Sequence, residues 1–258
     1  MEIKPIRMTI NAGLASADDA HASLSEHFRI VAKAVQAQFL ERYRGPTSSL
    51  SGEASALLGV VSDFLAVMSR LDAEYGLDST LPIEDAADAV DEALRALAEL
   101  ESWLIRFELL AQLYRLHTIE IGIGYWAMRH GLSVIAFEPI VNALAAQSNV
   151  AASTQEAAAV YAMMQGFINH FSPRLKADLE RSNPERPWRL LNLNFAITAI
   201  RTGDEDLMRF AFDTLNGHLP DERHGFYEEA HALVCQPGFP PATQKLIESE
   251  LARWTRVH

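Results

Sequence analysis

The chain has 258 residues and a formal net charge of −12, and so acidic a chain repels nucleic-acid phosphates and anionic membranes. Its composition is 49% hydrophobic and 22% charged, which is typical of a globular protein and not of a disordered one. The single cysteine, Cys235, excludes an internal disulfide and a cysteine zinc cluster. We therefore expect a cytoplasmic protein that binds neither nucleic acid nor membrane.

Helical patterning begins after a short N-terminal segment. Residues 1–16 show no helical period, and we interpret them as an arm or a short extended segment. Apolar residues then recur at spacings of three and four, which predicts the buried face of a helix at Leu24, Phe28, Val31, Val35 and Phe39. The segment 44–52, which contains Gly, Pro and Ser, ends this helix and starts the next.

Two further apolar stripes complete this part of the chain. The first is spaced alternately four and three, and it consists of Leu57, Val61, Phe64, Met68, Leu71 and Tyr75. Such a seam needs a partner helix, either within its own domain or in a second copy of the chain. The second stripe runs from Ala87 to Tyr114 and indicates one long helix or two helices joined near Trp103. We expect residues 17–116 to form an N-terminal bundle of about three helices.

One stretch of the chain is strongly acidic. Between Asp72 and Glu101 there are ten acidic residues and one basic residue, Arg95. Two interpretations remain open: a surface for a basic partner, or a solvated helix face that keeps the protein soluble.

From residue 117 to residue 258 the turn signals recur at a regular interval. Gly131 and Gly203 each follow a helical pattern and are 72 residues apart, with a turn signal between them at 165–173. Gly238 follows Gly203 after 35 residues. A fixed period of this length indicates stacked helical hairpins. The predicted hairpins span 117–148, 153–183, 187–219 and 222–255.

The third of these units resembles a tetratricopeptide repeat. Phe195 and Ala196 take the large–small pair of the first helix, Gly203 and Asp204 form the turn, Phe212 and Leu215 lie on the second helix, and Pro220 closes the unit. Asn192 stands at the Trp position of the repeat, and Ala199 stands at its Tyr position. The resemblance covers residues 187–220 and implies a right-handed superhelix of antiparallel helix hairpins.

The same resemblance implies a peptide-binding surface, because the first helix of each such hairpin lines the concave groove. Asn194 and Arg201 would lie there, with Arg129 at the corresponding position of an earlier unit. An amide and two guanidinium groups could hold a peptide backbone or a carboxylate. The alternative is that these side chains are simply solvated.

A candidate metal site lies near the C-terminus. His224, Glu228 and His231 are spaced four and three apart, which places them on one face of a helix, and two imidazoles with a carboxylate can bind zinc or iron. A carboxylate-bridged di-iron bundle needs a second Glu-x-x-His, and the chain offers only the reversed pair His117 and Glu120. The alternative is a set of surface side chains near the start of a helix.

These features predict an all-α protein, with a helical bundle followed by a hairpin array or with both parts in one continuous domain. The predicted function is a non-enzymatic interaction module, a scaffold, adaptor or regulator that binds a protein or peptide, and no cofactor is expected. One alternative is a metal-dependent or small-molecule-binding helical enzyme that uses His224, Glu228 and His231. Another is a chaperone or regulator of a secretion system. The apolar seam from Leu57 to Tyr75 could also serve a homodimer.

Overall fold

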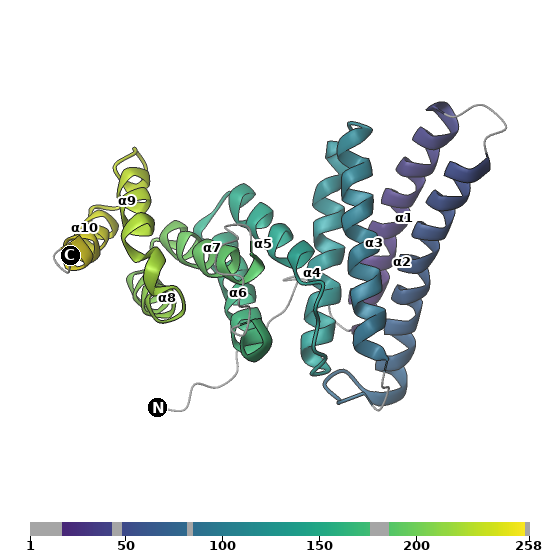
Figure 1. The fold of residues 1–258 in the computed structure, drawn as a ribbon, viewed down its shortest axis with the longest axis horizontal. Coiled ribbons are helices and arrows are strands. Elements are labelled where there is room, and N and C mark those ends of the chain that lie inside the picture. The colour runs from purple at the N-terminus through teal and green to yellow at the C-terminus, as the bar shows by residue number, and fades with distance from the viewer. Residues whose placement is uncertain (1–16, 43–47, 82–84, 176–185, 256–258) are drawn as a thin grey trace. The chain divides into compact units, whose positions relative to one another are not determined.

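The computed structural model describes residues 17–42, 48–81, 85–175 and 186–255, so the N-terminal arm expected at residues 1–16 lies outside the described residues. Within these ranges the regular structure is helical and contains no strand, which confirms the all-α prediction (Figure 1). The chain divides into two compact units, residues 1–144 and 145–258. Each unit is described by itself.

The first unit is built on a four-helix bundle. Its helices are α1 (Ala17–Arg42), α2 (Ser48–Tyr75), α3 (Ala86–Arg106) and α4 (Leu113–Arg129). Helix α1 packs against α2 and α4, and α3 packs against the same two helices, so each helix has two neighbours. The short helix η1 (Leu110–Gln112) precedes α4, and α5 (Glu138–Val150) crosses the division between the units.

The buried faces agree well with the apolar stripes. All five predicted residues of α1, from Leu24 to Phe39, are buried. On α2 the middle of the predicted seam is buried, but Tyr75 is 36% exposed, and Leu58 and Leu65 join the core. The segment Gly52–Tyr75 is long and apolar enough to cross a membrane by length and composition alone. In the bundle it packs between α1 and α3, as a core helix of a soluble bundle also would.

The long third stripe is two helices, and the break between them lies just after Phe107. The amide of Leu109 donates to the carbonyl of Leu104 (2.8 Å), and the amide of Glu108 donates to the carbonyl of Ile105 (3.1 Å). This is the Schellman arrangement that ends many helices. Glu108 takes the left-handed position with φ 58°, which a glycine normally occupies. The bundle therefore has a fourth helix, α4, in the region that the sequence assigned to the repeats.

Aromatic rings fill one end of the bundle. The ring of Phe39 near the end of α1 lies 5.0 Å from Trp103 and 5.1 Å from Phe107, between centroids, with edge-to-face geometry in both pairs. The guanidinium of Arg42 covers Phe107 at 5.0 Å from the ring centroid. These contacts join the C-terminal ends of α1 and α3, so α1 and α3 run in the same direction.

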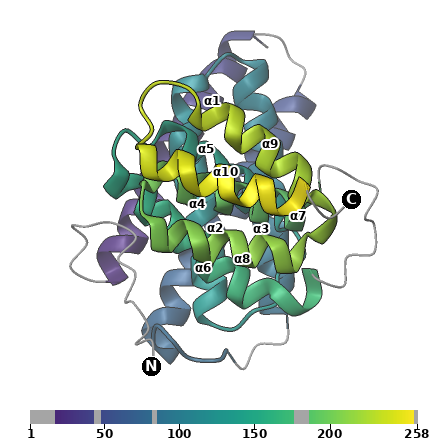
Figure 2. The same cartoon turned by 90° about the vertical axis from the view of Figure 1, so that its left-hand side faces the viewer.

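The second unit contains α6 (Thr154–Leu175), α7 (Pro187–Thr202), α8 (Glu205–His218), η2 (Pro220–Glu222), α9 (Arg223–Val234) and α10 (Pro241–Thr255). Helix α7 packs against both α6 and α8, and α10 lies beside α9 and also touches α8 (Figure 2). The predicted turn between α7 and α8 is confirmed: Gly203 has φ 69°, and Asp204 caps α8 by accepting from the amides of Asp206 and Leu207.

One predicted hairpin is wrong. The turn expected at 165–173 does not form, because α6 continues through this segment to Leu175. A buried stripe crosses Gly166 without interruption; it consists of Ala157, Val160, Tyr161, Met164, Phe167 and Ile168. Glycine inside a helix costs about 1 kcal/mol relative to alanine, which the burial of this stripe readily outweighs. Helix α6 is therefore a single long helix in place of the predicted hairpin.

Candidate functional site

The three residues predicted to line a peptide groove are bound within the chain. The side-chain amide of Asn194 donates to the carbonyl of Leu190 on its own helix (2.8 Å). Arg201 donates to Ser148 Oγ (3.0 Å) and to Asn149 Oδ1 (2.8 Å), and thereby ties α7 to the end of α5. Arg129 donates to Asp78 Oδ1 (3.0 Å) and to the carbonyl of Leu77. All three act here as structural hydrogen-bond donors.

The three predicted metal ligands lie on α9 but are divided between two ion pairs. His224 Nδ1 lies 3.4 Å from Glu228 Oε2, whereas His231 Nε2 lies 3.9 Å from Glu248 Oε1 on α10. His231 Nε2 also lies 3.8 Å from the sulfur of the exposed Cys235. Among the described residues, no group of three or more His, Cys, Asp or Glu side chains is arranged to hold a metal ion.

Two acidic residues of the stretch 72–101 have a structural use that neither interpretation of the sequence considered. Asp72, at the end of α2, is buried and accepts from Trp126 Nε1 (2.8 Å), His130 Nε2 (2.7 Å) and His21 Nε2 (2.8 Å). Burial alone would raise the pKa of Asp72, but these three hydrogen bonds outweigh it and lower the pKa below its ordinary value. Asp91 accepts from the amides of Ile135 and Ala136, at 2.8 Å each.

A second buried carboxyl group has no such partners. Glu120 on α4 is fully buried, and neither of its carboxyl oxygens has a hydrogen-bond partner among the described residues. Burial, and then the nearby charge of Glu101, raise the pKa of Glu120 well above its ordinary value. Glu101 itself pairs with His117 at 3.1 Å. Both effects favour the uncharged form of Glu120.

A hollow of the first unit lies on its surface, between α1 and α2. It has a volume of about 450 Å³. Its lining comes from both helices and combines small, apolar and polar side chains: Ser25, Phe28, Arg29, Ala32, Lys33, Gln36, Ser55, Leu58, Gly59, Ser62 and Leu65. A smaller hollow of about 280 Å³ lies between α8 and α10 and carries charges of both signs, with Glu205, Arg209 and Lys245 in its lining.

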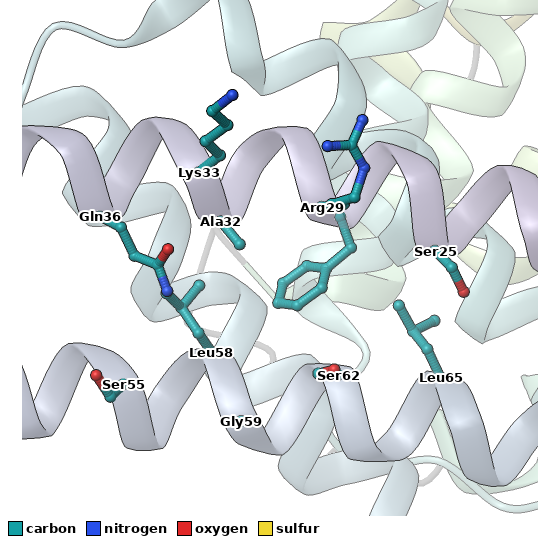
Figure 3. A pocket seen from close by; sticks show the side chains of 11 residues that line it. Ser25, Arg29, Ala32, Lys33, Gln36, Ser55, Leu58, Gly59, Ser62 and Leu65 are labelled. Atoms are coloured by element: carbon teal, nitrogen blue, oxygen red, sulfur yellow. The ribbon is translucent and has the colours of Figure 1, made fainter.

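The floor and the edge of the α1–α2 groove differ in chemistry. Phe28, Leu58 and Leu65 are buried beneath it and join the bundle core. Figure 3 shows Leu58 and Leu65 pointing from α2 toward α1, and Gln36 pointing from α1 toward α2. Arg29 and Lys33 project from the side of α1 that faces away from α2, so they form a cationic edge (Figure 3).

The two cations of this edge differ in whether they have a partner within the chain. Arg29 is bound by Glu26 through two hydrogen bonds, from Nε to Oε2 (2.7 Å) and from Nη2 to Oε1 (2.6 Å). That pair is exposed, and it keeps the charge of Arg29 compensated. Lys33 is exposed and has neither a hydrogen bond nor an ion pair with any described residue. The ammonium group of Lys33 is therefore available to a ligand.

The sequence analysis did not predict this groove, because its helix predictions were based on the large apolar residues. The signal was present in the small residues beside them: Ser55, Gly59 and Ser62 are spaced four and three apart, which places them on one line along α2. Small side chains at that spacing leave a depression between two packed helices. A Cβ atom added at Gly59 would meet no atom within 4 Å, which shows that the space above this residue is open.

Comparison of the chain with protein-family models, with curated proteins and with solved structures found no match.

Proposed function

We propose that this protein is a non-enzymatic interaction module that holds a segment of another protein in the groove between α1 and α2. The observation that carries the proposal is the groove itself, a hollow of about 450 Å³ on the surface of the bundle. A volume of that size is within the range of ligand-binding clefts.

The build of the groove supports binding. Its walls are two long helices whose inner faces are anchored in the core by Phe28, Leu58 and Leu65. A site on packed helices holds its shape better than a site on loops. Among the described residues that line the groove, none is His, Cys, Asp or Glu, the side chains that most often act as general acids and bases. This composition favours binding over proton-transfer chemistry.

The finer architecture of the second unit is also a proposal. We infer that α7 with α8, and α9 with α10, are tetratricopeptide-like hairpins that stack in a right-handed array. The packing of α7 on α8 and of α9 on α10 supports this, as does the left-handed turn at Gly203. In this arrangement α6 is the single helix that precedes the first hairpin. The chain would then join a binding bundle to a short repeat array.

The proposal is tested by selecting peptides on the full-length protein. A display library of random 20-residue peptides with helix-forming composition is panned on the wild type, and the affinities of the selected peptides are then measured by fluorescence anisotropy. Because nothing lies within 4 Å of a Cβ at Gly59, we expect Gly59→Leu to place its side chain in the groove. We expect the selected peptides to lose about tenfold or more in affinity for this variant, which corresponds to roughly 1.4 kcal/mol.

Two further variants make the result interpretable. Ser62→Leu fills the groove at a second position, which is exposed, and Ser69→Leu is the matched control, an exposed serine on the same helix outside the lining. Circular dichroism and urea denaturation verify that all three variants fold. Peptides that bind equally well to wild type and to both groove variants would show that the groove is not the binding surface.

A further inference from the structure

We infer that the segment held in the α1–α2 groove is an amphipathic α-helix with an acidic edge that pairs with Lys33. This inference rests on the proposed function and names the class of partner. Three observations carry it: the line of small residues on α2, the length of the groove, and the charge of its edge.

The small residues favour a helix as the occupant. Ser55, Gly59 and Ser62 form a line along α2, and small side chains at this spacing let a third helix approach two packed ones closely. A helix satisfies its own backbone hydrogen bonds. An extended peptide needs unpaired backbone groups from its receptor, and the backbone groups of α1 and α2 along the groove are used within their own helices.

The dimensions of the groove agree with a short helix. On α1 the lining runs from Ser25 to Gln36, and on α2 it runs from Ser55 to Leu65. At 1.5 Å per residue these segments are about 15–17 Å long, which matches about three turns of a bound helix. Recognition helices of this length contact their receptor through residues at i, i+3, i+4 and i+7.

The charge of the edge favours an acidic partner. Among the described lining residues there are two basic side chains and no acidic one, in a chain whose net charge is −12. Since Glu26 already compensates Arg29, the charge open to a ligand is that of Lys33. A carboxylate on the bound helix would pair with this ammonium group, whereas a lysine there would meet a like charge. Charge therefore selects the partner.

This partner differs from the basic one that the acidic stretch 72–101 suggests. Three exposed acidic residues of that stretch, Asp88, Glu92 and Glu99, belong to α3, and the exposed Glu74 near the end of α2 lies outside the lining of the groove. A basic partner would have to bind elsewhere on the bundle. The two predictions are therefore independent and concern different surfaces.

The experiment extends the peptide selection described above. The peptides that lose affinity on Gly59→Leu are sequenced, and their mean net charge is compared with that of the input library. Their affinities are then measured for Lys33→Glu and for Arg70→Glu, which reverses an exposed charge on α2 outside the lining. We expect acidic peptides, a loss of about tenfold on Lys33→Glu, and a change within about twofold on Arg70→Glu.

The outcomes separate this inference from the proposed function. Groove-dependent peptides that are neutral or basic on average, or that bind Lys33→Glu as tightly as Arg70→Glu, would overturn the acidic edge and leave the groove as the binding surface. The helix has its own test, because a proline at the middle of a selected peptide should abolish binding. Binding that tolerates this proline would overturn the helix, again without loss of the groove. A selection that yields no groove-dependent peptide would overturn both proposals.

Discussion

The carboxylate of Asp72 and the imidazole of His130 form a buried pair, with Oδ1 of Asp72 2.7 Å from Nε2 of His130. The other ring nitrogen of His130 lies 2.6 Å from the carbonyl oxygen of Ser79. A carbonyl oxygen only accepts a hydrogen bond, so Nδ1 of His130 faces Ser79 and Nε2 faces the carboxylate of Asp72. With His21 and Trp126 also bound to Asp72, this carboxylate connects α1, α2 and α4.

Replacing Asp72 with asparagine should destabilise the first unit strongly. Removal of one partner from a buried charged pair leaves the other uncompensated, and typical losses are about 3–5 kcal/mol. We expect Asp72→Asn to lose about 3 kcal/mol in the free energy of unfolding, measured by urea denaturation at pH 7. Asp63→Asn, an exposed aspartate of the same helix, is the control and should unfold like the wild type.

The contribution of Asp72 to the free energy of unfolding depends on pH. Because the pKa of Asp72 is lower in the folded protein, the unfolded chain binds its proton more readily. The resulting stability is present above about pH 3.9, the ordinary aspartate value, and is lost as the pH falls through the lower folded pKa. The difference in stability between wild type and Asp72→Asn should therefore shrink below about pH 4. A difference that stays constant from pH 7 to pH 3 would contradict the assignment.

Glu120 predicts the opposite dependence. Its folded pKa is raised, so above the ordinary glutamate value of about 4.3 the folded state binds more protons than the unfolded state, and stability falls as the pH rises. Glu120→Gln removes this titration, so we expect the variant to gain stability relative to wild type as the pH rises above about 4.3. Glu99→Gln, at an exposed position on α3, is the control. Parallel stability curves for wild type and Glu120→Gln would refute the buried neutral carboxyl.

Two Schellman turns in the first unit allow a matched comparison of backbone strain. Glu108 after α3 and Gly131 after α4 occupy the same left-handed position, with φ of 58° and 68°. A residue with a Cβ atom costs about 1 kcal/mol in this conformation. We expect Glu108→Gly to raise the free energy of unfolding by up to about 1 kcal/mol and Gly131→Ala to lower it by a similar amount. Equal and opposite shifts in thermal midpoint would verify the pairing, and a destabilised Glu108→Gly would contradict it.

Arg201 tests whether a predicted binding residue is structural. It is half-buried, and burial lowers its pKa, while its hydrogen bonds to Ser148 and Asn149 join α7 to α5. Because these partners would lose their donor, Arg201→Ala should cost about 1–2 kcal/mol in the free energy of unfolding. Arg209→Ala breaks an exposed pair with Glu205 and should change stability little. Equal stability of the two variants would contradict the structural role of Arg201 and leave a role in binding open.

The helices were predictable wherever a long apolar stripe was continuous. Most residues of the stripes on α1 and α2 are buried, as predicted. Each of these helices packs against two neighbours, and such packing buries a residue every three or four positions. The position of the break between α3 and α4 could not be predicted, because Glu108 occupies the left-handed position that a glycine marks in other turns. Conversely, Gly166 signalled a turn that the apolar stripe of α6 overrides.

The candidate site was harder to predict than the fold. The sequence directed attention to charged and aromatic residues such as Arg129 and Arg201, whose partners lie 51–53 positions away in the chain. Such pairings depend on tertiary packing and leave no local pattern. The groove depends on serines and a glycine, whose only signal is their spacing beside a stripe of larger residues. Asp72 and Glu120 are both carboxyl groups, and only the structure distinguishes the one with three donors from the one with none among the described residues.

The two ends of the four-helix bundle respond to different stresses. At one end Asp72 joins α1, α2 and α4 through charge, and at the other Phe39, Trp103 and Phe107 join α1 and α3 through aromatic packing. Acid weakens the first kind of contact, whereas cooling weakens the hydrophobic part of the second. Acid and cold should therefore weaken helix packing first at opposite ends of the bundle. Because the groove runs along α1 and α2 between those ends, each stress should reach it from the opposite end.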